Sequence, residues 1–121
     1  MLSVALVILS ATVVLGIALG LLYLRGGTRP PWMVGVLHGL FGTAGIATLI
    51  LALRGPPRGL LNGVASFGAI AAVLACVALV AGLGVVTLAR WSGCGVGLMI
   101  AVHGSLAITA YVLLIAYVAL G

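Results

Sequence analysis

Two histidines are the side chains of this sequence with the clearest capacity for chemistry. His38 and His103 each lie inside a long apolar run, and each is followed by a glycine. Ionisable side chains within membrane segments are costly and by default functional. A neutral imidazole is also a common ligand of metal ions and of haem iron. Two histidines in such similar surroundings therefore favour two ligands for one central group.

An offset of 65 residues relates the two halves of the chain. It aligns rare residues as well as common ones: Arg25 with Arg90, His38 with His103, Gly39 with Gly104 and Leu49 with Leu114. Matches of arginine and histidine carry weight because both residues are scarce here. The sequence therefore predicts a tandem repeat of two helix pairs, with halves of about 1–56 and 57–121.

The composition requires a membrane environment. Of the 121 residues, 65% are hydrophobic and 4% are charged, and no aspartate or glutamate occurs. Soluble domains carry about 25% charged residues. The lack of carboxylates excludes paired-carboxylate catalysis, Ser-His-Asp triads and oxygen cages for hard cations. The five arginines stand at the ends of apolar segments, which is typical of contact with lipid headgroups and not of nucleic-acid binding.

The chain is long enough for four membrane crossings joined by short loops. The expected segments are Leu2–Leu24, Trp32–Leu53, Leu60–Ala89 and Cys94–Leu120. All four must be helices, because lipid offers the backbone no hydrogen-bond partners and the runs lack the alternation of a barrel. We expect one all-α, four-helix transmembrane domain over 1–121. Cys76 and Cys94 are expected at different depths, as small hydrophobic residues without a disulfide.

Such a repeat places the two histidines at the same depth. Two helices return the chain to its starting side, so the second and fourth segments run in the same direction. At 1.5 Å per residue, His38 lies about 9 Å along its helix from Trp32, a residue typical of the interface. We expect the imidazoles to face each other near the first and third loops. Arginine counts weakly favour these loops as cytoplasmic, in a prokaryotic inner membrane.

Small residues follow each histidine on the same helix face, at positions i+4 and i+7. They are Gly42 and Gly45 after His38, and Ala107 and Ala110 after His103. Such a stripe leaves room for the edge of a flat porphyrin, and it equally allows close packing of helices. We therefore expect these four residues to line either a ligand or the tightest helix contact.

Further groups complete the predicted site. A ligating imidazole needs a partner for its other ring nitrogen, and the carbonyls one turn earlier, at Val34 and Met99, are the expected acceptors. Arg25, Arg29 and Arg90 stand on the same side of the membrane as the histidines. They are suited to anionic haem propionates or to lipid headgroups.

Paired histidines, small-residue stripes and four helices together resemble the membrane b-type cytochrome subunits. The resemblance implies a haem b whose axial ligands are His38 and His103. It also implies one-electron transfer with a quinone, a cytochrome or a neighbouring subunit, in a protein that is not an enzyme on its own. One haem in one leaflet does not carry electrons across the membrane, so other membrane subunits are expected. The end of the chain at Gly121, with no polar stop after Leu120, also favours a partner or a chain that continues.

Two alternatives remain open. The first is a structural or assembly subunit without a cofactor, in which the histidines hydrogen-bond between helices. The second is a metal or small-solute membrane protein, with Met33 and Met99 as soft copper ligands. Small residues such as Gly16 and Gly20 are expected to make close helix contacts, including contacts with another subunit.

Overall fold

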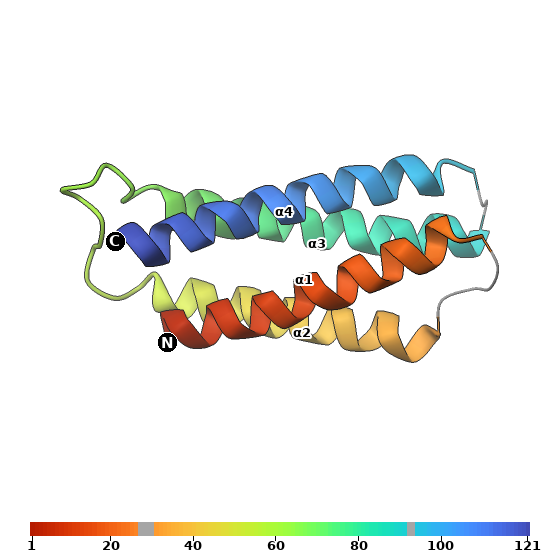
Figure 1. Cartoon of the computed structure of the whole chain (residues 1–121), viewed down its shortest axis with the longest axis horizontal. Helices are drawn as coiled ribbons and strands as arrows, with labels where there is room; N and C mark the ends of the chain where they lie inside the picture. Colours follow the sequence, from red (N-terminus) through yellow and green to blue (C-terminus); the bar gives the residue numbers. More distant parts are fainter. Residues whose placement is uncertain (27–30, 92–93) are drawn as a thin grey trace. The chain divides into compact units, whose positions relative to one another are not determined.

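Four α-helices make up the fold of the computed structural model, which describes residues 1–26, 31–91 and 94–121 (Figure 1). They are α1 (Leu2–Leu24), α2 (Trp32–Ala52), α3 (Phe67–Trp91) and α4 (Val96–Leu120). Each is long and apolar enough to span a membrane, and no strand occurs among the described residues. The expected all-α membrane fold is thus confirmed.

The helix boundaries agree with the expected ones to within two residues, except at the start of the third span. That helix was expected from Leu60, but α3 begins at Phe67. Gly59 and Gly63 both have φ near +70°, a left-handed backbone that breaks a helix. Residues 60–66 instead form turns, closed by the bond from the Val64 N–H to the Gly59 carbonyl at 3.0 Å. An apolar loop and an apolar helix look alike to a hydropathy pattern, which explains the difference.

The chain forms two compact units, Met1–Gly55 and Pro56–Gly121. In the first unit α1 packs on α2, and in the second unit α3 packs on α4. Within each unit the two helices run side by side in opposite directions (Figure 1). Each unit is therefore a helical hairpin, which we call the first hairpin and the second hairpin.

Several polar side chains within the helices hydrogen-bond to backbone carbonyls. Several hydroxyls donate to the carbonyl four residues earlier, such as Thr12 Oγ1 to Ile8 at 3.0 Å and Thr109 Oγ1 to Ser105 at 2.8 Å. No buried side-chain nitrogen or oxygen lacks a partner in the described part of the chain. This pattern suits lipid, where an unsatisfied polar group costs several kcal/mol.

Candidate functional site

His38 joins the two helices of the first hairpin. Its Nδ1 lies 2.9 Å from the carbonyl oxygen of Thr12 on α1. A carbonyl only accepts hydrogen bonds, so Nδ1 carries the proton and donates it. In the neutral ring the lone pair is then on Nε2.

His103 makes the same interaction in the second hairpin. Its Nδ1 donates to the carbonyl oxygen of Ala78 on α3 at 2.7 Å. The tautomer argument is the same, so both histidines have the lone pair of the neutral ring on Nε2. This is the nitrogen that ligates a metal when Nδ1 is held by a carbonyl.

A glycine of the neighbouring helix lies against each imidazole ring. A Cβ built on Gly16 would lie 2.9 Å from Cε1 of His38, and one built on Gly82 would lie 3.0 Å from Cε1 of His103. In both hairpins the glycine comes four residues after the residue whose carbonyl accepts the hydrogen bond. We call each set of carbonyl, glycine and imidazole an imidazole seat. The first seat is Thr12, Gly16 and His38, and the second seat is Ala78, Gly82 and His103.

The seats correct the predicted acceptors. The sequence pointed to Val34 and Met99, one turn before each histidine in its own helix. The imidazoles instead reach across to the neighbouring helix of the hairpin. The carbonyl acceptors and the role of the two glycines were both missed. One signal could have found the glycines, because residues at similar distances from the connecting loop face each other in an antiparallel hairpin. Gly16 lies eight residues before the end of α1 at Leu24, and His38 lies six residues after the start of α2 at Trp32.

The stripe after His38 faces α1. A Cβ on Gly45 would lie 2.7 Å from both Cγ and Cδ2 of Leu9, and one on Gly42 would lie 3.4 Å from Cγ2 of Thr12. Of the two roles predicted for these glycines, the tightest helix contact fits their surroundings in the first hairpin. In the second hairpin Ala110 is buried at 5% exposure, while Ala107 is half-buried.

The glycines expected to contact a partner subunit differ in their surroundings. Gly16 lies against the imidazole of His38 in its own hairpin, and its contact with another subunit stays a prediction. A Cβ on Gly20, one turn later, would meet no described atom within 4 Å. Close packing within a hairpin, the other predicted role, applies to Gly16 and Gly82.

The arginines lie at helix ends. Arg25 caps the carboxyl end of α1, and Arg90 lies in the last turn of α3; both are exposed. Each therefore follows, on the same helix, the glycine of a seat. Arg29 lies outside the described residues.

Sulfur-containing side chains are the other candidate metal ligands of the sequence. Cys76 and Cys94 are both free thiols, as expected. The thioether of Met99 packs on α3, where a Cβ on Gly84 would lie 3.5 Å from its sulfur. No group of three or more His, Cys, Asp or Glu side chains occurs within residues 1–26, 31–91 and 94–121.

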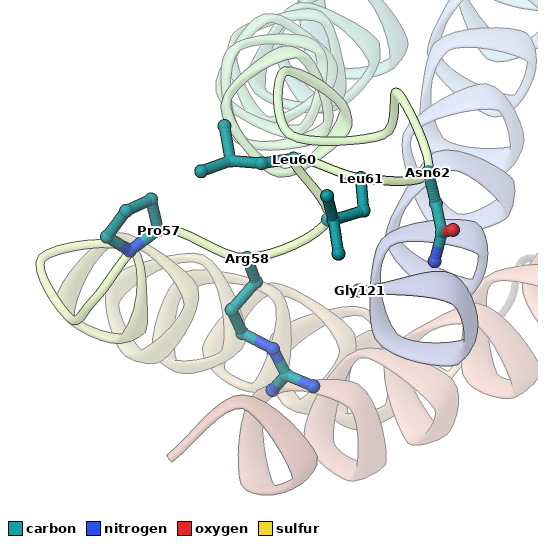
Figure 2. A pocket seen from close by; sticks show the side chains of 7 residues that line it. Pro57, Arg58, Leu60, Leu61, Asn62 and Gly121 are labelled. Atoms are coloured by element: carbon teal, nitrogen blue, oxygen red, sulfur yellow. The ribbon is translucent and has the colours of Figure 1, made fainter.

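A pocket of about 300 Å³ lies in the second hairpin, away from the seat. Figure 2 shows the loop before α3 passing beside the carboxyl end of α4, with the amide of Asn62 directed toward that end. The Asn62 amide donates to the carbonyl of Leu120 at 2.5 Å. Leu120 is about 25 Å along α4 from His103 at 1.5 Å per residue, so the pocket is separate from the imidazole. The full lining is Pro57, Arg58, Gly59, Leu60, Leu61, Asn62 and Gly121.

Comparison of the chain with protein-family models, with curated proteins and with solved structures finds no match.

Proposed function

We propose that the chain is a haem b-binding membrane protein that transfers electrons within a larger complex, with His38 and His103 as the two axial ligands. The observation that carries the proposal is the pair of Nδ1 hydrogen bonds to the carbonyls of Thr12 and Ala78. Two histidines in two hairpins have the same tautomer and the same kind of acceptor. A ligating histidine commonly has this partner on its other ring nitrogen.

The donor chemistry of the residues fits the group. Bis-histidine ligation requires two neutral imidazoles, each with its lone pair on the nitrogen directed at the iron. Haem bound in this way supplies one-electron transfer, and its ligand bonds need not break. Without any carboxylate in the sequence, the histidines have no acidic neighbour to compete for their Nδ1 protons.

The chain's own groups would also tune such a site. A bond from Nδ1–H to a carbonyl raises the basicity of the ligating nitrogen. The arginines at the ends of α1 and α3, Arg25 and Arg90, have no acidic side chain in the sequence with which to pair. We propose that they bind the anionic propionates or, failing that, lipid phosphates. A quinone, a cytochrome or another subunit would exchange the electron.

A second candidate function has its own support. The seats also join α1 to α2 and α3 to α4, as expected of a structural or assembly subunit without a cofactor. In this case the hydrogen bonds between helices are the whole purpose of the histidines. The packing of Gly42 and Gly45 against α1 favours this second candidate, because that stripe then has a role without a porphyrin.

An optical spectrum distinguishes the two candidates. The protein is expressed in a haem-replete membrane, extracted in mild detergent and recorded oxidised and dithionite-reduced. Haem ligation predicts sharp α and Soret bands in the difference spectrum. The matched control is the double variant H38A/H103A, prepared in parallel, which should have no such bands. Wild-type protein that is folded and colourless, also after incubation with haemin, would overturn the haem proposal and favour the structural subunit.

A further inference from the structure

We propose that Gly16 and Gly82 are positioning residues that set the orientation of the two imidazoles. Each glycine leaves open the space beside the carbonyl four residues before it, and the imidazole of the facing helix occupies that space. The hydrogen bond from Nδ1 to the carbonyl depends on this opening. The positioning role is argued from the geometry of the hairpins alone. Only the statement that the positioned imidazoles bind haem rests on the proposed function.

The distances are too short for a methyl group unless the ring moves. At Gly16 a Cβ would lie 2.9 Å from Cε1 and 3.5 Å from Nδ1 of His38. At Gly82 the same distances to His103 are 3.0 and 3.1 Å. Carbon atoms in favourable contact are about 3.5–4.0 Å apart. The ring would have to move, and it is held by its hydrogen bond rather than being the loose end of a flexible chain.

Helix geometry explains why the glycine is four residues after the acceptor. Residue i+4 of a helix donates its own N–H to the carbonyl of residue i, so the two groups lie on one face. The Cα–Cβ bond tilts toward the amino terminus of the helix, and hence toward that carbonyl. A side chain at i+4 therefore covers the second lone pair of the oxygen. With glycine there, the carbonyls of Thr12 and Ala78 can accept a second hydrogen bond from the imidazole.

The two seats share the glycine although their acceptor residues differ. Threonine supplies the carbonyl in the first seat and alanine supplies it in the second, because the acceptor is a backbone atom. The side chain of the acceptor residue is therefore not the common requirement. The common feature is a glycine against each ring: a Cβ built on it would lie at nearly the same distance from Cε1 in both seats.

The test uses nitrogen NMR of the full chain with ¹⁵N-labelled histidine. The protein is in bilayers, and any bound haem is kept reduced. The chain has two histidines, so each gives one set of ring signals. The wild type should show two protonated, hydrogen-bonded Nδ1 atoms. Gly16→Ala should shift or remove that signal for His38 alone, and Gly82→Ala should do so for His103 alone. Unchanged ring signals in both alanine variants would overturn the proposal.

Gly20→Ala is the matched control, because it puts the same methyl on the same helix where no described atom lies within 4 Å. It should leave both histidine signals as in the wild type. A change in Gly20→Ala as large as that in Gly16→Ala would show a general effect of alanine on α1 and would also overturn the proposal.

A second comparison covers the case in which Gly16→Ala does not fold. The double variant G16A/H38A removes the ring that the methyl would strike. If the double variant folds where Gly16→Ala does not, the clash with the imidazole is established. If alanine prevents folding in both backgrounds, the glycine serves helix packing and the positioning role is wrong.

Different results would reject the haem proposal and the positioning role of the glycines. A colourless protein whose histidine signals respond to Gly16→Ala and Gly82→Ala retains the seats and loses the haem. A haem-loaded protein should instead show altered low-spin g-values in each alanine variant, because these values depend on the orientation of the ligand planes. Unaltered g-values together with unaltered ring signals would retain the haem and reject the positioning role.

Discussion

On the helix face that follows each histidine, the first hairpin has glycines at the positions four and seven residues later, whereas the second hairpin has alanines there. Gly45 in α2 and Ala110 in α4 take the corresponding positions seven residues after each histidine, and both are buried. Further along, Leu49 and Leu114 are the largest fully buried side chains, each 1% exposed. The imidazole seat is thus the same in two hairpins whose packing below it differs.

The correspondence between the hairpins requires two offsets. The second helices match at 65, through the histidines and the buried leucines. In the first helices Gly16 matches Gly82 and Ala5 matches Ala71 at an offset of 66, and both alanines are fully buried. The arginines at the ends of these helices, Arg25 and Arg90, still match at 65. A single offset of 65 aligns the histidines but not the glycines beneath them. The tandem repeat stays a prediction, and the seats show which residues it would have to relate.

The largest effect is expected from removing either imidazole. If both histidines ligate one haem, His38→Ala and His103→Ala should each abolish the six-coordinate low-spin spectrum to the same extent. Without haem, each loses only a hydrogen bond between helices, worth about 0.6 kcal/mol in membrane proteins. Spectra of the two single variants decide this. A normal six-coordinate signal in either variant would show that the histidine removed is not a haem ligand, and that the two hairpins differ in function.

The next effect is expected from a large side chain at Gly45. Gly45→Leu would place its Cβ 2.7 Å from Leu9 Cγ and force α1 and α2 apart. Overpacking of this kind costs about 1–3 kcal/mol. The control is Gly39→Leu, where a Cβ meets no described atom within 4 Å. Thermal unfolding in detergent should show a lower midpoint for Gly45→Leu than for Gly39→Leu, and equal midpoints would contradict the packing role.

A smaller effect is expected from Asn62, which ties the loop before α3 to the end of α4 in the second hairpin only. Asn62→Ala removes the hydrogen bond to the Leu120 carbonyl. A typical net value is about 0.5–1.5 kcal/mol, and this exposed bond belongs at the low end. Hydrogen exchange should speed up in the last turn of α4 and remain unchanged in α2. Equal change in both helices would mean that Asn62 acts on more than its own hairpin.

The smallest effect is expected from exchanging the acceptor side chains. Thr12→Ala and Ala78→Thr leave the backbone carbonyls in place, so the Nδ1 signals of both histidines should stay as in the wild type. Thr12 Oγ1 donates to Ile8 within its own helix, not to the imidazole. Loss of the His38 signal in Thr12→Ala would show that the hydroxyl, and not the carbonyl, holds the ring. The same histidine-labelled NMR experiment provides the measurement.

The sequence by itself determined the spans, because a chain this apolar and without acidic residues must satisfy its backbone within helices. It also singled out His38 and His103, because rare ionisable residues stand out in apolar runs. Its one clear failure in the helices, the start of α3 at Phe67, comes from glycines whose left-handed backbone a hydropathy pattern does not register.

Only the tertiary structure decided what each histidine touches. Its acceptor is a carbonyl on another helix, and a carbonyl leaves no trace in the residue type, as the pair Thr12 and Ala78 shows. The roles of Gly16 and of Gly45 depend on how far one helix slides along the other. Successive residues of a helix point about 100° apart. If the contact moved by one residue along α1, another residue would therefore lie against the ring.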